Sequence, residues 1–571
     1  MKKALTLSLM LCISAMLKSQ DSIVLVKKYN DFFFPTNHTS MSDFNSKLIH
    51  PGQNSSFGNN LWQTDGTTVN TSTFLATSSL ITGYTPSAIV SALGKLFFVS
   101  KFNSNKSLYV TDGTSIGTVK LCNIGSIISE NMLINPKVAN GKLFFTKDST
   151  ATGAELWATD GTLAGTQMVK DIAVGNSSGV SKAFCAVFGN KFYFVANNIA
   201  NGEELWVTDG TSANTQMVYD LHNGTSSTNF TSNFFVFNSH LYFTATVSGF
   251  KYGLYKTDGT VGVMPTLETG NLTLTSNAVV HQNAILFGAT TYTPTMYSPF
   301  GDLYSISTST PNMVGDLSYN DAVLGTVKGT NAILGTNGTD LFLSVNTTNL
   351  GTELWGYSVA NNTVTLLKDI ATGTLSGIDN SNFDYDIWFT NKKTVLGNKF
   401  VFVAQSRSNG VTSGNGSHQE EIWTSDGTTA GTNKAISTYS LFTFTDYAYN
   451  SMTIFNGDVY FYGSTSASSS SDATLWKLKL GIASSIKDNV KESIDLVVYP
   501  NPVKDILNLK FHLLSTEPTF IRITNILGEE VLTETITSGN FALKTNSFRS
   551  GVYFVTVTNK NNQSTKKFII E

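Results

Sequence analysis

Acidic side chains recur in this sequence at two fixed places of a repeated pattern. The stretches ELWATDGT (155–162) and ELWVTDGT (204–211) each place a Glu two residues before a Trp and an Asp three residues after it. Carboxylates at regular spacing are candidates for calcium binding or proton transfer. A calcium loop needs several oxygen ligands at alternate positions, whereas each TDGT offers a single carboxylate. We therefore predict that the Asp-Gly pairs form tight hairpin turns, since both residues tolerate positive φ.

These predicted structural turns recur along the chain at the same point of the repeat. They consist of Asp65 and Gly66, Asp112 and Gly113, Asp160 and Gly161, Asp209 and Gly210, Asp258 and Gly259, and Asp426 and Gly427.

The repeated glutamates argue against catalysis. A catalytic acid is normally unique in a protein, whereas this Glu returns in several units, which favours a contact at a blade edge or turn. The His residues are scattered, and the sequence has no HExxH, GxSxG, Walker A or Rossmann pattern in context. We predict no catalytic residue and no cofactor, which favours a protein that is not an enzyme. The repeated glutamates are Glu155, Glu204, Glu353 and Glu421.

One acidic segment is a weak candidate for a metal site. The stretch DNSNFDYD contains Asp379, Asp384 and Asp386, but a solvated loop explains it more simply. We therefore predict no metal ion.

An aromatic residue follows Leu or Ile in nine units and sets the period of the chain. Successive spacings are 47, 48, 49, 49, 49, 51, 68 and 53 residues, a period typical of propeller blades. Because each aromatic adjoins an apolar residue, we predict core packing rather than sugar stacking, for which Tyr292, Tyr297 and Phe300 in an irregular segment are better suited. The repeat core aromatics are Trp62, Tyr109, Trp157, Trp206, Tyr255, Trp355, Trp423 and Trp476, with Tyr304 in a degraded unit.

The second of the four strands expected in each unit predicts the packing. GKLFFVS (94–100) and NKFYFVA (190–196) are continuously apolar, so both faces of this strand must be covered. A sheet held between two neighbouring blades meets that need. We therefore predict an all-β fold with a β-propeller of nine four-stranded blades, eight being the alternative because propellers usually hold ~4–8.

The ends of the repeat predict how the ring closes. The last unit stops after its third strand, and SIVLVKKY (22–29) resembles the fourth-strand pattern TQMVKDI. We predict that residues 23–29 complete the final blade, which gives a propeller over residues 20–480. Closure removes exposed sheet edges.

The N-terminus predicts export. Residues 1–19 combine Lys2 and Lys3 with a short apolar run, as in a secretory signal peptide. No later stretch is long and apolar enough to predict a transmembrane segment. The net charge of −3 disfavours nucleic acid as a partner. With Cys122 and Cys185 as the cysteines left after cleavage, no disulfide framework is expected.

The C-terminal region follows a polar linker at 481–495 and contains about seven short strands, which predict a small Ig-like β-sandwich over 496–571. It resembles the type A C-terminal sorting domain of the bacterial type IX secretion system. That resemblance implies export through the outer membrane, with the type IX machinery as partner, and release or attachment at the cell surface. The matching motif residues are Tyr499, Pro500, Asn501, Pro502, Gly551, Val552, Tyr553, Lys566 and Lys567.

The repeat region resembles bacterial surface proteins with ELWxTDGTxxGT repeats, a set that implies a fold rather than an activity. We expect an exported scaffold that binds a glycan or protein, as in adhesion, through loops on one face. Two alternatives remain. One is a secreted polysaccharide-degrading glycosidase or lyase, which would need close carboxylates at the central axis. The other is a structural coat or motility-associated protein that self-associates.

Overall fold

The structure consists of two compact units that are described separately. It is a computed structural model, and one unit spans Asp21–Leu480 while the other contains Gly481–Glu571. The predicted signal peptide (1–19) and linker (481–495) lie outside the described residues. These are residues 22–29, 41–54, 58–75, 85–102, 105–125, 137–180, 184–230, 234–247, 252–291, 300–307, 311–317, 320–321, 323–371, 374–378, 393–405, 420–435, 452–463, 474–480, 496–510, 519–525, 530–536, 540–546, 548, 550–559 and 562–571.

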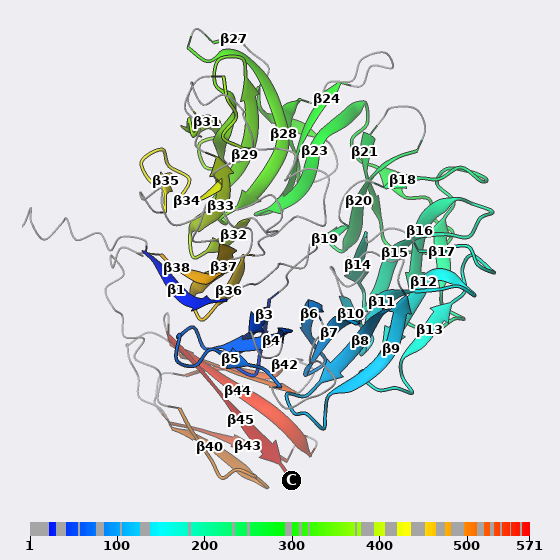
Figure 1. Ribbon diagram of the computed structural model, residues 1–571. Helices are drawn as coiled ribbons and strands as arrows, with labels where there is room; N and C mark the ends of the chain where they lie inside the picture. The colour runs from blue at the N-terminus through cyan, green and yellow to red at the C-terminus, as the bar shows by residue number, and fades with distance from the viewer. Residues whose placement is uncertain are drawn as a thin grey trace, which may run out of the picture. The chain divides into compact units, whose positions relative to one another are not determined.

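The first unit is built from antiparallel sheets that follow one another in chain order (Figure 1). We number these sheets as blades. Blade 1 holds β2 (Ser42–Phe44), β3 (Lys47–Asn54), β4 (Gly58–Thr64) and β5 (Ser72–Thr73). Blade 2 holds β6 (Thr85–Ala92), β7 (Lys95–Phe102), β8 (Asn105–Thr111) and β9 (Val119–Gly125). Blade 3 holds β10 (Lys137–Ala139), β11 (Lys142–Ser149), β12 (Gly153–Thr159) and β13 (Gln167–Lys170).

The middle blades repeat the same order, and blade 5 has an additional short strand that pairs with β20. Blade 4 holds β14 (Cys185–Phe188), β15 (Lys191–Asn197), β16 (Glu203–Thr208) and β17 (Gln216–Tyr219). Blade 5 holds β18 (Asn229–Phe230), β19 (Phe235–Phe237), β20 (His240–Thr246), β21 (Tyr252–Thr257) and β22 (Thr266–Leu267). Blade 6 holds β23 (Leu272–His281), β24 (Ala284–Thr291), β25 (Asp302–Ile306) and β26 (Asn312–Gly315).

The last three blades include the one that joins the two ends of the unit. Blade 7 holds β27 (Asn320–Asp321), β28 (Gly325–Thr336), β29 (Asp340–Thr347), β30 (Gly351–Ser358) and β31 (Thr363–Lys368). Blade 8 holds β32 (Lys393–Leu396), β33 (Lys399–Gln405), β34 (Glu420–Ser425) and β35 (Asn433–Lys434). Blade 9 holds β36 (Thr453–Phe455), β37 (Asp458–Gly463), β38 (Thr474–Lys479) and β1 (Ser22–Lys28). In the described residues the blades number nine, which confirms the larger of the two predicted counts.

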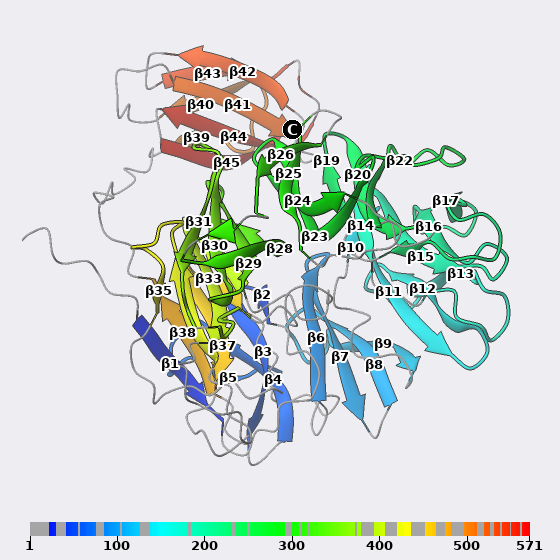
Figure 2. The ribbon, with the colours of Figure 1, turned by 90° about the horizontal axis from the view of Figure 1, so that it is seen from above.

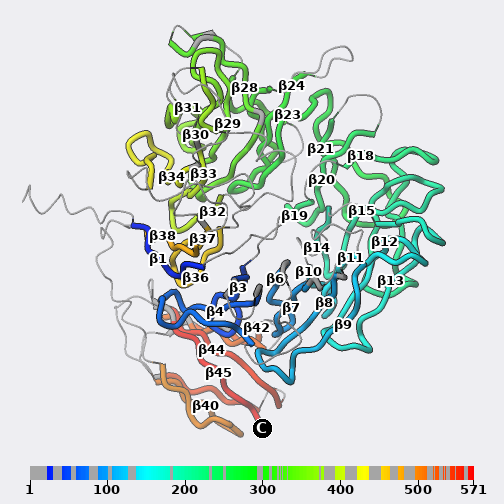
Figure 3. The backbone as a smooth tube through the Cα atoms, viewed as in Figure 1, coloured from blue at the N-terminus to red at the C-terminus, as the bar shows by residue number. Residues whose placement is uncertain are grey.

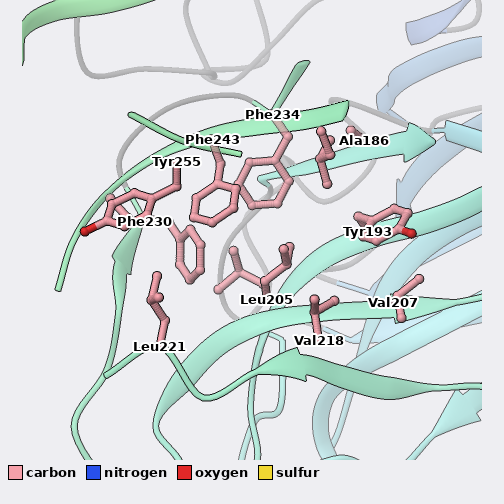
Figure 4. Packing of buried hydrophobic residues seen from close by; sticks show 13 residues of the cluster. Ala186, Tyr193, Leu205, Val207, Val218, Leu221, Phe230, Phe234, Phe243 and Tyr255 are labelled. Carbon is pink, nitrogen blue, oxygen red and sulfur yellow. The ribbon is translucent and has the colours of Figure 1, made fainter. Parts of the chain in front are cut away.

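Each blade buries both of its faces against its neighbours. In β7, Phe98 packs toward blade 1 and Phe97 toward blade 3, because successive strand residues point to opposite sides. Figure 4 shows the core between blades 4 and 5, which contains Tyr193 and Leu205 from blade 4 and Phe243 from blade 5. This packing explains the run of consecutive apolar residues at positions 96–99 of the second strand β7.

The Leu-Trp pair of the third strand divides its side chains in the same way. Leu205 packs toward blade 5, whereas Trp206 packs back onto blade 3. The predicted core aromatics are buried in this manner except Trp157 and Tyr304, which are half-buried against the cores of blades 2 and 3 and of blades 5 and 6. Burial of an aromatic side chain at each joint supplies much of the apolar area that holds the ring together.

The ring closes where the two ends of the unit meet. Strand β1 is antiparallel to β38, with Ser22 opposite Lys479 and Leu25 opposite Trp476. It thus takes the fourth-strand place that the sequence analysis assigned to residues 23–29. Blade 9 then packs on blade 1 through a core that contains Val26. The views in Figures 2 and 3 follow the blades around to this joint.

The second unit is a β-sandwich of two antiparallel sheets, as predicted. Its shared core includes Leu507, Ile523 and Val555, which are fully buried. One sheet has the order β39 (Val497–Tyr499), β40 (Ile506–Lys510) and β43 (Asn540–Lys544). The other has the order β42 (Glu530–Ile536), β41 (Thr519–Asn525), β44 (Gly551–Asn559) and β45 (Asn562–Ile570).

Candidate functional sites on the two faces of the ring

The antiparallel order of the strands gives the ring two different faces. The turn face carries the turns between first and second strands, such as residues 140–141, and the loops between third and fourth strands, such as residues 160–166. The loop face carries the connections between second and third strands, such as residues 198–202, and the connections from one blade to the next, such as residues 171–180.

The Asp-Gly pairs lie on the turn face, but they do not form the tight hairpins that the sequence predicted. In blade 3 the pair opens a loop over residues 160–166. Asp160 Oδ1 accepts hydrogen bonds from the backbone and hydroxyl of Thr162, at 2.8 and 2.7 Å. The hydroxyls of Thr159 and Thr166 meet at 2.8 Å across the base of the loop. The prediction was wrong in turn type because the whole TDGTxxGT pattern, rather than Asp-Gly alone, shapes the connection.

The same contacts set the charge of these aspartates. Hydrogen bonds from the Thr two residues later lower the pKa of Asp65, which also accepts from Asn70. These hydrogen bonds, which come from within the loop, keep the turn-face carboxylates ionised. The pKa is lowered in the same way at Asp112, Asp160, Asp209 and Asp258.

The glycine of each pair lets the preceding blade reach the loop. Lys95 Nζ of blade 2 donates to the carbonyl of Gly161 in blade 3 at 3.1 Å, and Lys142 Nζ of blade 3 donates to that of Gly210 at 2.9 Å. At Gly259 (φ +82°) a Cβ would lie 2.1 Å from the hydroxyl oxygen of Tyr193 in blade 4. These turn-face loops therefore fasten each blade to the one before it.

The repeated glutamates lie at the loop-face end of the third strand, where Glu155, Glu204 and Glu353 are buried and Glu421 is half-buried. Glu353 accepts hydrogen bonds from the backbone N–H groups of Ile370, Ala371 and Gly377, which belong to the connection into blade 8. Burial raises the pKa of Glu353 to about 8, against the opposing effect of these donors. Burial raises the pKa of Glu204 to about 7 and also raises that of Glu155. Glu421 instead pairs with Lys434 Nζ at 2.6 Å.

Sequence reasoning missed the acidic partners of these glutamates. Asp171, Asp220 and Asp369 each follow their Glu by 16 residues and begin the connection that the Glu holds. The Asp raises the pKa of the neighbouring Glu in all three blades. The 16-residue offset between Glu and Asp can be seen in the sequence, where the Asp lies in the KDI and YDL stretches. It indicates a spatial pair only once β12 and β13 are known to be adjacent strands.

The remaining predicted site residues do not converge on one place in the described residues. Asp379, Asp384, Asp386, Tyr292 and Tyr297 lie outside them. Lys328 Nζ lies 5.9 Å from the ring centre of the half-buried Phe300. Across the described ranges, no three His, Cys, Asp or Glu side chains are grouped to hold a metal ion. The same ranges contain no helix that has the length and hydropathy of a membrane span.

Several of the sorting-domain motif residues lie on the last strand or contact it. Asn501 Oδ1 accepts from the backbone N–H of Ile569 at 2.9 Å, which docks the Tyr-Pro-Asn-Pro segment beside β45. The ring of Tyr553 stacks on that of Phe568 at 5.7 Å. Lys566 and Lys567 are exposed on the same strand. Gly551 and Val552 begin β44, paired with Ile570 and Ile569.

The family comparison identifies this second unit. Residues 497–571 match the family described as the secretion system C-terminal sorting domain. The chain therefore carries a type IX sorting domain, which implies recognition by that machinery and export across the outer membrane to the surface or medium. No curated protein matches the chain.

Solved structures resemble the chain at low sequence identity. PorZ, described as a bacterial surface component of the type IX secretion system of Porphyromonas gingivalis, is 11% identical over 94% of this chain and 86% of that chain, with a TM-score of 0.25. The extracellular domain of a putative one-component system from B. thetaiotaomicron is 11% identical over 95% and 87%, with a TM-score of 0.21. The β-propeller domain of a protease from Pyrococcus furiosus is 10% identical over 62% and 98%, with a TM-score of 0.29.

Proposed function

We propose that the protein is an exported scaffold that binds a protein or glycan at the bacterial surface through the loop face of its ring. The observation that carries this proposal is the difference between the two faces. Turn-face polar groups are used in contacts within and between blades, as at Asp160 and Lys95. The loop-face connections differ in length and sequence from blade to blade, which suits specific recognition.

Exposed apolar side chains on the loop face mark a candidate binding patch that can be tested by mutation. Val174 is 80% exposed in the connection from blade 3 to blade 4, and Ile199 is 56% exposed between β15 and β16. The connection that carries Val174 contacts the end of β15, because the backbone N–H of Asn197 donates to the carbonyl of Gly179 at 2.8 Å, and Ile199 follows Asn197 by two residues. Exposed apolar groups on two adjoining segments are suited to a binding patch.

A comparison of the two faces tests the proposal. The mature chain is screened on a glycan array and against surface-protein extracts, and each ligand found is titrated against two double variants. Val174→Arg with Ile199→Arg changes the loop face, and Ile116→Arg with Leu163→Arg changes exposed apolar residues of the turn face. We expect at least a tenfold loss of affinity for the first and no change for the second, whereas the reverse result contradicts the proposal.

The alternative of a polysaccharide-degrading enzyme is tested on the same samples. Its chemistry needs a carboxyl pair that reaches a glycosidic bond. The paired glutamates on the loop face, Glu155, Glu204 and Glu353, have no exposed surface. Release of reducing sugar or of unsaturated product from the bound glycan would replace the scaffold proposal with an enzymatic one.

A further inference from the structure

Three blades share an acidic motif that the proposed function does not explain. In blades 3, 4 and 7 a Glu at the start of the third strand is followed by an Asp 16 residues later and by a Ser 23 residues later. The Ser hydroxyl accepts from the backbone one residue before the Glu, as from Ala154 to Ser178 at 3.1 Å. The triplets are Glu155, Asp171 and Ser178; Glu204, Asp220 and Ser227; and Glu353, Asp369 and Ser376.

The Glu of each motif holds the connection to the next blade against the strand. Glu155 Oε1 accepts from the backbone N–H groups of Ala173 and Gly179, at 3.1 and 3.0 Å. Glu204 accepts from the backbone N–H of Leu221 and from the hydroxyl of Thr228. The connection therefore has a defined shape in which the Asp is fixed close to the Glu.

Buried carboxylate oxygens in these motifs receive no hydrogen bond from the protein. They include Oε2 of Glu155, a residue with no exposed surface, and Oδ1 of Asp171 beside it. Oδ1 of Asp220 and Oδ1 of Asp369 are likewise buried and receive no hydrogen bond from the protein. A positive charge near both groups would stabilise a buried Glu carboxylate beside a half-buried Asp, because burial and the repulsion between the two carboxylates both oppose ionisation.

The other blades show what the same two positions do when they are not both acidic. In blade 2 the positions hold Ser107 and Asn123, again 16 residues apart, and the Ser hydroxyl donates to Asn123 Oδ1 at 3.1 Å. The two side chains therefore meet at this place in the fold. In blade 8 the Glu keeps its place, but position 437 is Ser and the charge of Glu421 is met by Lys434.

The neighbouring lysines do not serve this purpose in the acidic blades. Lys170 precedes Asp171, but its Nζ donates to the carbonyl of Thr215 in blade 4 at 2.8 Å. Lys147 lies with its Nζ 3.7 Å from the ring centre of Trp157. Lys368 lowers the pKa of Asp369 by less than burial raises it.

From this geometry we propose that the Glu–Asp pairs of blades 3, 4 and 7 bind a hard divalent cation of the calcium type. Calcium prefers oxygen ligands and combines carboxylates with main-chain carbonyls and water. The two carboxylates come from the third strand and from the connection to the next blade, so a bound ion ties these two elements together on the loop face. Sites of this kind in extracellular modules bind calcium at roughly 0.1–1 mM, concentrations that an exported protein meets outside the cell.

The test measures ions bound to the full mature chain after treatment with EDTA. We expect about three Ca²⁺ ions per chain by equilibrium dialysis at about 5 mM Ca²⁺, a concentration above the weak end of that range. We also expect Tb³⁺ luminescence excited through the Trp two residues after each Glu, namely Trp157, Trp206 and Trp355. Asp171→Asn, Asp220→Asn and Asp369→Asn should each remove one ion, and the triple variant should remove all three.

The Asn variants also address folding. An Asn at these positions can donate its amide to the Glu, so the triple variant should have an unchanged or higher Tm in EDTA and lose the rise in Tm that Ca²⁺ gives the parent protein. Asp160→Asn on the turn face is the matched control and should bind as many ions as the parent. Failure of the parent to bind Ca²⁺ or Tb³⁺ would overturn the proposal in favour of a shared proton. Undiminished binding by the triple variant would overturn it equally. Neither result bears on ligand recognition, which is measured separately.

Discussion

The two faces of the ring use the same kind of side chain for different purposes. On the turn face, Asp160 is exposed, and its Oδ1 accepts two hydrogen bonds from Thr162 of its own loop. On the loop face, Glu155 is buried, and one of its oxygens has no donor from the protein. Blades 3 and 4 thus combine a loop whose Asp is hydrogen-bonded within the loop at one end with a buried Glu beside an Asp at the other. The loop face is therefore where we propose that binding occurs.

The largest expected effect comes from breaking the joint on which both faces depend. Val26 has no exposed surface and lies in the core between blades 9 and 1, so Val26→Asp places a charge in that core. We expect a loss of more than about 4 kcal/mol in the free energy of unfolding, or no folded protein. The neighbouring Leu25 is 44% exposed, and Leu25→Asp should cost less than about 1 kcal/mol by urea unfolding. Equal effects of the two changes would contradict the closed ring.

The loop face is tested next through the glutamate that holds three backbone donors. Glu353→Ala leaves the N–H groups of Ile370, Ala371 and Gly377 without their partner. We expect a loss of about 3 kcal/mol, since an unsatisfied buried donor costs ~1–3 kcal/mol. Glu353→Gln keeps an acceptor oxygen and should cost about 1 kcal/mol in the same denaturant titration. Equal stability of the Ala and Gln variants would mean that the hydrogen bonds accepted by Glu353 do not stabilise the fold.

The turn face is tested by two glycines in one loop. Gly259 and Gly262 have φ of +82° and +84°, but a Cβ has open space at Gly262 and meets the Tyr193 hydroxyl at Gly259. Gly262→Ala should cost about 1 kcal/mol for the left-handed backbone alone. Gly259→Ala should cost about 2–3 kcal/mol, because the contact with blade 4 is also disturbed. A larger loss of stability for Gly262→Ala than for Gly259→Ala in thermal unfolding would show that the contact between Gly259 and blade 4 is unimportant.

The smallest effect concerns pH at the closing joint. His50 is fully buried, and its Nδ1 lies 3.0 Å from the carbonyl oxygen of Pro51 and 2.9 Å from the Tyr462 hydroxyl. Burial lowers the pKa of His50 to about 4, below its ordinary value of about 6.5. The neutral form therefore favours the fold, so the contribution of His50 to stability is complete above a pH of about 6.5 and declines as the pH falls toward about 4.

The matched variant for this pH effect is His50→Gln, which removes the titrating group. Tm measured between about pH 7.5 and about pH 4 should fall less steeply in the variant than in the parent. Parallel Tm profiles would mean that His50 does not contribute to the acid sensitivity of the joint.

Much of the ring could be predicted because the residue pattern of the repeat indicates how each blade packs against its neighbours. The continuous apolar second strand required cover on both faces, and residues such as Phe97 and Phe98 do pack toward opposite neighbours. The place of β1 followed from a missing fourth strand in the last unit. These inferences need the pattern of a strand and no knowledge of loop conformation.

The contacts of the loops could not be predicted in the same way. The Asp-Gly pair suggested a tight hairpin, while the hydroxyls of Thr159 and Thr166 bridge a longer loop. The pairing of Glu155 with Asp171 depends on which residues of the third and fourth strands lie opposite each other, and a register irregularity lies between Leu156 and Trp157 at this point. Such irregularities depend on local hydrogen bonds rather than on hydrophobic periodicity.

Ring closure is the claim on which both faces rest, and one crosslink tests it directly. Ser22 and Lys479 are exposed register partners on β1 and β38. The double variant Ser22→Cys with Lys479→Cys should bring the two introduced thiols close enough for a disulfide. In the oxidised mature protein we predict a monomer with an intramolecular disulfide between these two positions, found by mass spectrometry and absent from the Ser22→Cys single variant. Free thiols at both positions, or disulfide-linked dimers alone, would contradict a ring closed by its own N-terminal strand.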